Sequence, residues 1–268
     1  MTLRIVMAGA TGWVGKAFVP AILAQGDMKL VGAVSRSAAG QDIGAAIGVA
    51  PAGVTAAASL AEALEQPSDV VVDYTKPNVV KDNALRAIAG GRHVVIGTSG
   101  LGASDYAEID AAARANGVGV IAAGNFSITA TLMKRFAVMA AKYVPDVEII
   151  DYASAKKPDA PSGTARELAE ALADIRGAST AKPVADVTGV PGTRGAAVGA
   201  GAGVHVHALR LPSYILSCEA LFGLPDERLT IRHDAGSSAA PYVAGTLLAI
   251  RRVGEFKGLV RGLDALMD

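Results

Sequence analysis

The stretch Leu3–Gly15, LRIVMAGATGWVG, combines a short apolar run with glycines at every third position. The apolar run predicts a strand, and Trp13–Ala24 carries apolar residues at the spacing of a helix. Gly9, Gly12 and Gly15 therefore fall in a strand-to-helix turn, where missing side chains let backbone amides and the helix dipole approach a pyrophosphate. We interpret this turn as a dinucleotide-binding site; the alternative is a tight turn that serves close packing alone.

The same alternation of strand and helix continues through the first half of the chain. Further strands are expected at Lys29–Val34, Asp69–Tyr74, His93–Gly97 and Val118–Ala122, and helices near Leu60–Leu64, from Pro77 onward and around Ser104–Ala115. Strands that alternate with helices predict an α/β architecture, here a Rossmann-type doubly wound parallel sheet with right-handed crossovers.

Beyond Asn125 the regular alternation of strand and helix ends, and a second unit begins. Helices are expected at Ile128–Lys142 and Thr164–Ile175, and strands at Val147–Ala153, Val204–Leu211, Ile215–Phe222 and Arg228–His233. Strands that follow one another through short turns predict a mixed or antiparallel sheet, and hence a second, α+β domain. Lys182–Gly203 is rich in Gly, Pro and Ala and has weak periodicity, so we expect a long mobile loop there, a lid or a subunit arm.

The apolar helix expected at Ala239–Val253 needs a partner surface, which the first domain could supply. We therefore predict a first domain of residues 1–126 and 238–268, around the glycine turn, and a second domain of residues 127–237. The chain would then leave the first domain once and return to it at its end.

Charge and composition argue against several classes of partner. The 268 residues carry 25 basic and 25 acidic side chains without a block of like charge, which argues against a nucleic-acid partner. No apolar run approaches the roughly 20 residues that span a bilayer, and no basic leader precedes the first strand, so we expect a soluble, cytoplasmic protein without membrane contact. Cys218 is the only cysteine, which excludes an internal disulfide and a cysteine-rich metal site.

The histidines do not form a metal-ligand pattern. His205 and His207 alternate on one expected strand and so share a face, which would suit a metal ion or acid catalysis. No cysteine or third histidine lies near them in the sequence, so we interpret them as strand packing and predict no metal. His93 is expected to be a satisfied histidine at a strand end and not a catalytic one.

The end of the second expected strand bears on the choice of cofactor. An NAD-preferring site usually places an acidic residue there, about 20 positions after the last glycine, to bind the ribose hydroxyls. This chain has Ser35, Arg36 and Ser37 instead. An arginine neutralises a 2′-phosphate and hydroxyls hydrogen-bond to it, so we predict NADPH as the preferred cofactor and NADH as the alternative. A solvated surface arginine is the competing explanation.

Residues after the later strands are expected to frame the nicotinamide, because open α/β sheets bind ligands at the carboxyl ends of their strands. They include Pro77, the segment Gly97–Gly100, and the polar residues Asn125 and Ser127, which could alternatively cap the next helix. The predicted cofactor-binding residues are Gly9, Thr11, Gly12, Trp13, Val14, Gly15, Ser35, Arg36, Tyr74, Thr75, Gly97, Thr98, Ser99, Asn125 and Phe126.

Four motifs follow in order along most of the chain: DYTKP at Asp73–Pro77, GTSG at Gly97–Gly100, GNFS at Gly124–Ser127 and KPDAPSGTA at Lys157–Ala165. With the glycine turn, they resemble the dihydrodipicolinate reductase family, whose pattern includes Asp-Phe-Thr-x-Pro, Gly-Thr-Thr-Gly, Pro-Asn-Phe-Ser and Lys-x-Asp-Ala-Pro-Ser-Gly-Thr-Ala. The resemblance implies NAD(P)H-dependent reduction of 4-hydroxy-tetrahydrodipicolinate in lysine biosynthesis, with hydride passing to an iminium carbon. It also implies that the second domain binds substrate and mediates oligomerisation, usually as a homotetramer.

The KPDAPSGTA motif is suited to binding a carboxylate. Pro161 and Ser162 precede an expected helix, which leaves first-turn amides to bind an anion, and Lys157 adds a positive charge. In the family, the lysine and the Gly-Thr pair hold the dicarboxylate. The predicted substrate-binding residues are Lys157, Ser162, Gly163, Thr164 and Thr98, and Lys157 is also the catalytic candidate. Ser162 and Thr164 could also act as helix caps.

The sequence departs from the family at its proposed acid. The family has two adjacent histidines, beginning four residues before the lysine, where this chain has Ala153 and Ser154. Alanine cannot donate a proton, so Lys157, Tyr152 or a water would have to replace the acid, or the reaction would differ.

Three functions are compatible with these residues. The first is the family's reduction of a cyclic imine dicarboxylate, and it is our prediction. The second is the same hydride chemistry on another imino, amino or oxo acid, which the changed histidines motivate, as does Cys218-Glu219 in place of a Glu-His pair of relatives, although His233 matches another family histidine. The third is a dinucleotide-binding protein without turnover, since a fold does not guarantee a reaction.

Overall fold

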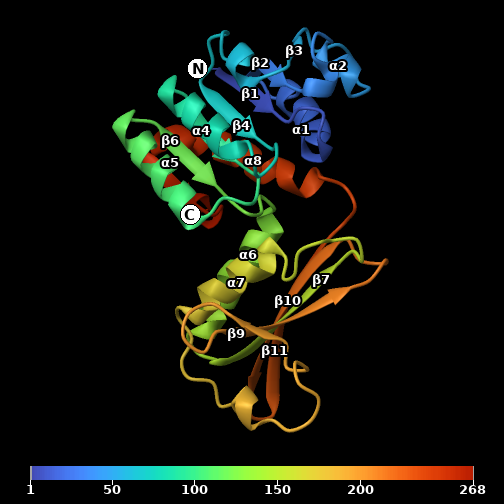
Figure 1. Cartoon of the computed structure of the whole chain (residues 1–268), viewed down its shortest axis with the longest axis vertical. Helices are drawn as coiled ribbons and strands as arrows, with labels where there is room; N and C mark the ends of the chain where they lie inside the picture. The colour runs from blue at the N-terminus through green and yellow to red at the C-terminus, as the bar shows by residue number, and fades with distance from the viewer. Residues whose placement is uncertain (1, 268) are drawn as a thin grey trace. The chain divides into compact units, whose positions relative to one another are not determined.

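The computed structural model describes residues 2–267, which form two compact units (Figure 1). The first unit comprises the residues up to Ile128 together with those from Ala239 onward, and the second comprises Thr129–Ser238. The second unit is therefore inserted into the first along the chain.

The first unit is built on a seven-stranded sheet with the order β12-β6-β5-β4-β1-β2-β3, in which every pair is parallel. Its strands are β1 (Leu3–Ala8), β2 (Met28–Val34), β3 (Ala56–Ala57), β4 (Val70–Asp73), β5 (His93–Ile96), β6 (Gly119–Ala122) and β12 (Gly258–Arg261). Its helices are α1 (Trp13–Leu23), α2 (Ile43–Ala46), α3 (Leu60–Ala63), α4 (Val80–Ala89), α5 (Ala103–Ala115) and α8 (Ala240–Arg252), with 3₁₀ turns at Arg36–Ala38, Val253–Glu255 and Asp264–Leu266. The chain builds outward from β1 first through β2 and then through β4, so a topological switch point lies between β1 and β4.

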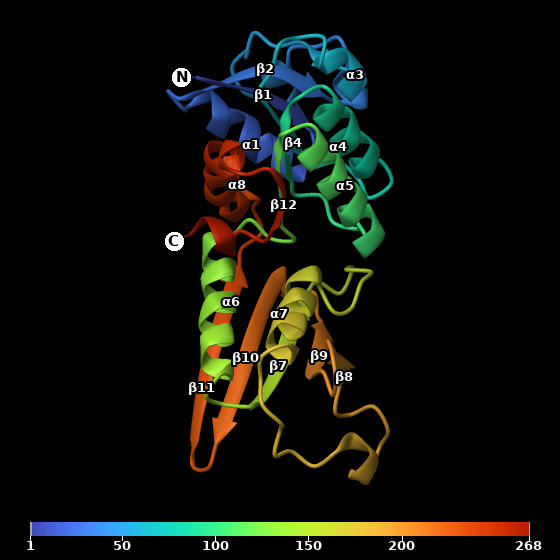
Figure 2. The ribbon, with the colours of Figure 1, turned by 90° about the vertical axis from the view of Figure 1, so that its left-hand side faces the viewer.

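The central strands of this sheet are buried on both faces, which explains why their sequences are mainly apolar and do not alternate with polar residues. In β1, Ile5 and Met7 belong to the core formed with α1 and α8, whereas Val6 belongs to the core formed with α4 and α5. Figure 2 shows these two helix pairs on opposite sides of the strands. Each fully buried side chain of this size contributes roughly 1.5–3 kcal/mol.

The second unit holds a five-stranded sheet with the order β11-β10-β7-β9-β8. Its strands are β7 (Asp146–Ala153), β8 (Ala196–Val198), β9 (Val204–Arg210), β10 (Leu216–Leu224) and β11 (Glu227–Ala235), and its helices are α6 (Ile128–Ala141) and α7 (Gly163–Ala173). The sheet is mixed, because β7 runs parallel to β9 and antiparallel to β10. Both helices pack on one face, where Met133, Leu168 and Phe222 share a core (Figure 2). The two sheets confirm the predicted fold class.

The segment Lys182–Gly203 is not a loop throughout, so that part of the sequence prediction is wrong. It contains a 3₁₀ turn at Val184–Asp186 and the strand β8, which pairs antiparallel with β9 at the sheet edge. The turn back into β9 requires glycine, because Gly203 has φ +61° and a Cβ there would lie 2.9 Å from the amide nitrogen of Val198. Pairing with β9 orders β8, and a weak local periodicity cannot reveal such pairing.

Helix α4 begins at Val80, three residues later than the start predicted from Pro77. Pro77 lies in a turn instead, where the carbonyl of Lys76 accepts hydrogen bonds from the amides of Val79 and Val80. The elements α2, β3 and β12 have no counterpart among the predicted ones, because each spans only two to four residues and is defined by tertiary contacts.

Among residues 2–267, no helix combines the length and the apolar character that a bilayer crossing requires. In the same part of the chain, no three His, Cys, Asp or Glu side chains are grouped as metal ligands would be.

Candidate active site

The glycine turn after β1 leaves no room for side chains. Gly9 has φ +84°, and a Cβ there would lie 2.3 Å from the carbonyl oxygen of Tyr74. A Cβ at Gly15 would lie 2.3 Å from the carbonyl oxygen of Gly9, and one at Gly12 would lie 3.1 Å from the same oxygen. Gly12 is the N-cap of α1 and brings no side chain to cover the first-turn amides. The turn therefore fits the pyrophosphate of a dinucleotide, which binds at such helix starts.

Hydroxyl groups gather at the end of β2. The hydroxyl oxygens of Thr11 and Ser35 are 2.7 Å apart, and those of Ser35 and Ser37 are 3.2 Å apart. Ser35 is buried, whereas Arg36 is exposed at the start of a 3₁₀ turn. The structure thus brings Thr11 from the glycine turn together with Ser35, next to a cationic residue.

Trp13 and Val14 open helix α1. The Trp13 side chain is 54% exposed and packs edge-on against Tyr242 of α8, with 5.7 Å between the ring centroids. Val14 is partly buried against the core of the first unit. The side chains of both residues therefore pack against neighbours or remain exposed. The backbone amides of both residues lie in the first turn of α1, where an anion could bind.

Asp73, the last residue of β4, is fully buried and connects the loops after β4 and β5. Its Oδ1 accepts hydrogen bonds from the amide and the hydroxyl of Thr75, at 3.0 and 2.6 Å, and from the hydroxyl of Thr98, at 2.7 Å. Its Oδ2 accepts a hydrogen bond of 2.8 Å from the Asn83 side chain on α4. Thr75 and Thr98, both predicted cofactor residues, are thus brought together through a carboxylate outside the predicted site.

Tyr74 fills the space beside these loops. Its hydroxyl lies 2.7 Å from Oγ1 of Thr246, and its ring packs edge-on against the buried Phe126, with 6.1 Å between centroids. Burial raises the pKa of Tyr74 above its usual range, so the phenol keeps its proton. Gly97 is needed next to this ring, because a Cβ there would lie 2.1 Å from it. The side chains of Tyr74 and Phe126 therefore shape the loops from within.

Ser99 and Asn125 follow β5 and β6. Ser99 is exposed in the loop after β5, so its hydroxyl is accessible to a ligand. The side-chain oxygen of Asn125 accepts a hydrogen bond of 2.8 Å from the amide of Ser127, ahead of α6. This contact is the helix-capping role that the sequence indicates as an alternative for Asn125.

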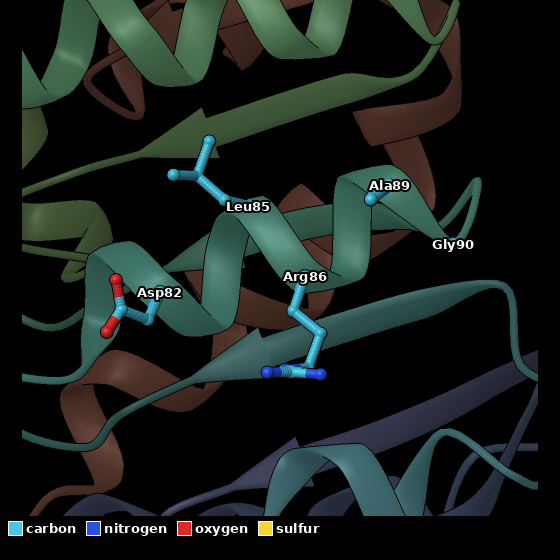
Figure 3. A pocket seen from close by; sticks show the side chains of 5 residues that line it. All are labelled: Asp82, Leu85, Arg86, Ala89 and Gly90. Carbon is cyan, nitrogen blue, oxygen red and sulfur yellow. The ribbon is translucent and has the colours of Figure 1, made fainter.

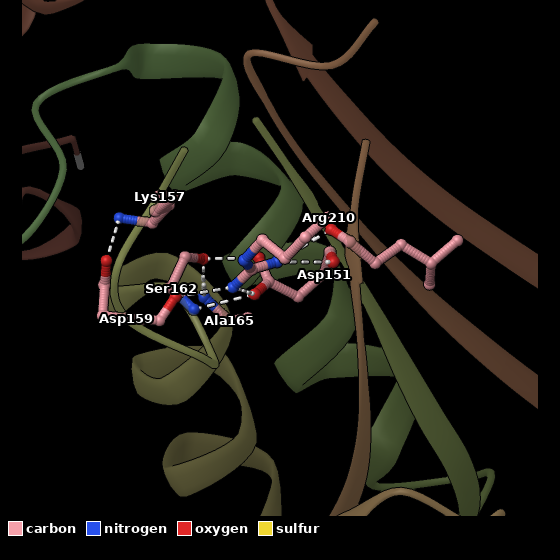
Figure 4. Close-up of polar contacts among 7 residues, drawn as sticks. Asp151, Lys157, Asp159, Ser162, Ala165 and Arg210 are labelled. Carbon is pink, nitrogen blue, oxygen red and sulfur yellow. Dashed lines mark hydrogen bonds and ion pairs between the residues drawn. The ribbon is translucent and has the colours of Figure 1, made fainter. Parts of the chain in front are cut away.

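The KPDAPSGTA motif forms the turn between β7 and α7 (Figure 4). The ammonium nitrogen of Lys157 lies 2.7 Å from Oδ1 of Asp159, and the lysine side chain is 29% exposed. Burial alone would raise the pKa of Asp159, but the hydrogen bond from Lys157 together with the charges of Lys157 and Arg210 holds this pKa below its usual value. The turn therefore presents an accessible positive charge that is balanced by an acidic neighbour.

Ser162 caps helix α7. Its hydroxyl accepts a hydrogen bond of 3.3 Å from the amide of Ala165 and donates one of 2.6 Å to Asp151. Its own amide donates to the other carboxylate oxygen of Asp151 at 2.8 Å. With 1% exposure and its proton directed to Asp151, the Ser162 side chain acts here as a cap. Gly163 and Thr164 begin the helix, where amides project from the first turn.

The fully buried Asp151 and the partly buried Arg210 form an ion pair beneath this motif, and neither is a predicted site residue. Nη2 of Arg210 lies 2.8 Å from Oδ2 of the fully buried Asp151 and donates at 2.8 Å to the carbonyl of Asp159. The pair thus holds the motif at two places, Asp159 through Arg210 and Ser162 through Asp151 (Figure 4). The sequence signal that could have indicated it is an aspartate within the apolar strand VEIIDYA, since a buried carboxylate requires partners.

Ala153 and Ser154, at the positions of the family's histidines, end strand β7. Ala153 is fully buried. The hydroxyl of Ser154 accepts a hydrogen bond of 3.3 Å from the amide of Lys156. The backbone carbonyl of Ser154 accepts one of 2.9 Å from the amide of Lys157. These residues shape the turn that carries the lysine, and neither offers the titrating group that a histidine would supply.

Tyr152 points to the other face of the sheet, because Asp151 contacts α7 and successive strand residues alternate between faces. The Tyr152 hydroxyl donates to Glu219 at 3.3 Å, and the guanidinium of Arg232 lies 4.8 Å from the centre of its ring. Burial raises the pKa of Tyr152, with the charge of Glu219 as the next cause. Tyr152 and Ser162 thus lie on opposite faces of the sheet, which separates this tyrosine from the KPDAPSGTA motif.

Three of the four histidines form hydrogen bonds within the two units, whereas the buried Nδ1 of His205 on β9 has no hydrogen-bond partner among residues 2–267. His93 accepts a hydrogen bond of 2.9 Å from the first amide of β6, which confirms a satisfied histidine at a strand end. His233 is buried with Nδ1 3.1 Å from the Thr129 hydroxyl, and burial lowers its pKa. His207 lies on β9 with Nε2 2.7 Å from Glu148.

An open depression runs along α4 (Figure 3). It is lined by Asp82, Leu85, Arg86, Ala89 and Gly90. Its carboxylate and its guanidinium come from a single helix, and no predicted site residue lines it. The depression is therefore not part of the candidate active site.

The family model described as dihydrodipicolinate reductase, N-terminus, matches residues 3–126, and the one described as dihydrodipicolinate reductase, C-terminus, matches residues 129–267. The 4-hydroxy-tetrahydrodipicolinate reductase of Desulfitobacterium hafniense is 40% identical over 268 residues, which cover 99% of each chain. The enzyme of the same name from Synechococcus elongatus is 39% identical over 272 residues, which cover 99% of this chain and 98% of the relative. The solved structure of a dipicolinate-bound dihydrodipicolinate reductase from Paenisporosarcina sp. TG-14 matches with a TM-score of 0.83 over 100% of both chains, at 31% identity. The resemblance inferred from the motifs is thus confirmed, and this chain belongs to the dihydrodipicolinate reductase family.

Proposed function

We propose that this chain catalyses the reduction of 4-hydroxy-tetrahydrodipicolinate by a reduced nicotinamide dinucleotide, a step of lysine biosynthesis. The observation that carries the proposal is the turn between β7 and α7, where the Lys157 ammonium lies on the segment that leads into a helix start. A cation and first-turn amides on one short segment suit a dicarboxylate. Relatives named 4-hydroxy-tetrahydrodipicolinate reductase, which are about 40% identical over nearly the whole chain, support this proposal.

The first unit is proposed to hold the cofactor, with the pyrophosphate at Gly9, Gly12 and Gly15. When bound there, a reduced nicotinamide supplies a hydride. We propose NADPH as the preferred form. The exposed Arg36 and the hydroxyl of Ser35 would bind a 2′-phosphate, and the acidic residue that would favour the ribose hydroxyls of NADH does not occur at these positions.

The second unit is proposed to hold the substrate. The Lys157 ammonium pairs with one substrate carboxylate, which replaces or shares the contact with Asp159. The amides of Gly163 and Thr164 receive carboxylate oxygens at the start of α7. Ser162 contributes by fixing the helix start through its contacts with Asp151.

The reaction also consumes a proton. Ala153 and Ser154 offer no group that titrates near neutral pH, and Tyr152 faces the opposite side of the sheet from the motif. We therefore propose that Lys157, or a water molecule that it orders, delivers the proton, which makes Lys157 both an anchor and a catalytic residue.

A second candidate function keeps the hydride chemistry and changes the substrate. The specific observation in its favour is the pair Ala153 and Ser154, which replaces two side chains that the family uses at the reacting ring. A different imino, amino or oxo acid with a carboxylate would still suit Lys157.

The test follows the oxidation of NADPH and of NADH with freshly generated 4-hydroxy-tetrahydrodipicolinate and, in parallel, with a panel of other imino and oxo acids. A kcat/KM for the first substrate well above that for every other acid supports the proposed function. A clear preference for another acid supports the second candidate. Tight NADPH binding without turnover of any acid would leave only a dinucleotide-binding protein.

We also propose a homotetrameric, cytoplasmic enzyme. The sheet face opposite α6 and α7 carries partly exposed apolar residues such as Ile150 and Leu221 beside charged ones, as an interface would. The reaction depends on the reduced nicotinamide pool inside the cell. Light scattering coupled to size-exclusion chromatography measures the oligomer, and a monomer would contradict this part of the proposal.

A further inference from the structure

The hydrogen-bond pattern around Asp73 determines which way two threonine hydroxyls point. Asp73 lies at 0% exposure at the end of β4, and Thr75, Thr98 and Asn83 supply four hydrogen bonds to its two oxygens. These donors are uncharged. A buried carboxylate is tolerated when its oxygens are satisfied by hydrogen bonds, and ionised it can only accept them.

The proton of the Thr98 hydroxyl must therefore point toward Asp73, across 2.7 Å. The same hydroxyl oxygen accepts a hydrogen bond of 2.7 Å from the amide of Thr75. One proton is thus committed and one lone pair is used, so the Thr98 side chain has no proton left for a substrate carboxylate. The Thr75 hydroxyl is committed in the same way, at 2.6 Å from Asp73.

The position of this cluster follows from the sheet order. Ser35 and Arg36 follow β2 on one side of β1, whereas Asp73 and Thr98 lie at the ends of β4 and β5 on the other side. A dinucleotide that crosses the switch point with its adenosine half beside β2 directs its other half toward β4 and β5. The glycine turn touches this side directly, because a Cβ at Gly9 would lie 2.3 Å from the Tyr74 carbonyl.

We propose that Asp73 is a positioning residue for the nicotinamide half of the cofactor site. It fixes the loop after β4 through Thr75, the loop after β5 through Thr98, and α4 through Asn83. Thr98 acts by holding these loops in place, and the neighbouring exposed Ser99 presents the accessible hydroxyl. The inference rests on the proposed dinucleotide-dependent function.

The test compares two ligands that differ only in the nicotinamide. Asp73→Asn keeps the shape of the side chain, removes its charge and turns one acceptor into a donor that faces other donors. Calorimetry without substrate is expected to show an NADPH dissociation constant raised about tenfold, which corresponds to about 1.4 kcal/mol. The dissociation constant of 2′-phospho-ADP-ribose, which has every part of NADP except the nicotinamide, is expected to stay unchanged.

Three further variants separate positioning from general stability. Asp69→Asn, just before the other end of β4, removes a carboxylate that Arg4 contacts at 2.6 Å and should affect neither ligand. Thr98→Ser keeps the hydroxyl and should bind NADPH like the parent, whereas Thr98→Val should reproduce the loss. In turnover, Asp73→Asn should lower kcat more than it raises the KM of the imine substrate, because the hydride donor is misplaced and the carboxylate anchor is intact.

The outcomes distinguish this inference from the proposed function. If the parent protein binds neither ligand, the dinucleotide site itself is wrong. If the parent binds both and Asp73→Asn weakens both equally, or neither, the positioning role is overturned. If Asp73→Asn fails to fold, the comparison of Thr98→Val with Thr98→Ser decides in the same way.

Discussion

Lys157 and Asp159 form an ion pair within one turn of the chain, with 2.7 Å between Nζ and Oδ1. In the proposed substrate site, an incoming carboxylate therefore meets a lysine that already has an acidic partner. Both side chains are partly exposed, and such pairs contribute only about 0–1 kcal/mol. Under the proposed function, a substrate carboxylate that also contacts the start of α7 would therefore displace Asp159 at little cost in free energy.

Removal of this lysine is the most direct test of the substrate site. Lys157→Ala is expected to lower kcat/KM by about tenfold to a hundredfold or more, since a hydrogen bond to a charged group is worth about 1.5–3 kcal/mol and the proton source is lost as well. The NADPH dissociation constant should not change. Steady-state kinetics and calorimetry measure both, with the exposed neighbour Lys156→Ala as the matched control. Equal losses in the two variants would contradict the assignment.

Arg36 is expected to determine cofactor preference. Arg36→Ala should weaken NADPH binding by about tenfold or more, because a charge-assisted contact with the 2′-phosphate is lost, and should leave NADH binding unchanged. Competitive binding measurements with both cofactors test this, with the exposed Arg86→Ala on α4 as a control. An equal affinity for NADPH in the parent and in Arg36→Ala would show that the arginine is only a solvated surface residue.

The ion pair between Arg210 and the buried Asp151, beneath the KPDAPSGTA motif, should matter for stability. Arg210→Met leaves Asp151 without its cation at 0% exposure, and breaking a buried pair in this way costs about 3–5 kcal/mol. Urea unfolding followed by hydrogen exchange in β7 and α7 measures the loss. Arg228→Met, at an exposed position of β11, should change stability by less than about 0.5 kcal/mol. Substrate KM should rise in Arg210→Met alone, because the motif loses one of its attachments.

The second unit should lose stability in acid through Asp234. The hydrogen bonds from Arg232 and Ser217, with the charge of Arg232, lower the pKa of Asp234 from 3.8 to about 2. Because the folded-state pKa is depressed, the stabilisation is fully present above pH 3.8 and disappears as the pH falls toward about 2. As the pH falls through this range, the thermal unfolding midpoint of the parent should approach that of Asp234→Asn. Since the pair is exposed, high salt should reduce the difference, and a difference that grows in acid would refute the assignment.

Cys218 is expected to be unreactive in the folded protein. Burial raises the pKa of its thiol to about 12, and the residue is 1% exposed on the helix-facing side of β10. The thiolate is the reactive form, so a thiol reagent at mildly alkaline pH should label the protein only after unfolding. Rapid labelling of the native protein would mean that β10 opens.

The predictable part of the fold is the part with strong apolar periodicity. The strands at Leu3–Ala8 and His93–Ile96 are buried on both faces, so their sequences alone identify them. Strands β8 and β12 are defined by pairing with β9 and β6, and such partners are distant or weakly patterned in the sequence. Local signals also place the start of α4 too early, because a proline suits a helix start and a preceding turn alike.

In the candidate site, too, local features could be predicted from the sequence and long-range contacts could not. The helix start after Ser162 is predictable from the motif itself, since serine and glycine at such positions indicate a cap. The contact between Asp151 and Arg210 joins residues 59 positions apart, and no local pattern links them. The clustering of Thr75 and Thr98 is likewise a consequence of parallel strand neighbours, although the aspartate at the end of β4 could have indicated it.

Because the second unit is inserted into the first, the ribosome synthesises the last part of the first unit after the whole second unit. Helix α8 and strand β12 follow Ser238 in the chain, yet they complete the core around Phe18 and pair with β6. A nascent chain therefore carries an open sheet edge and an uncovered apolar surface on its first unit until nearly the whole protein has left the ribosome. Such surfaces are prone to aggregation, so we expect the first unit to be exposed to this hazard for longer than the second unit during translation.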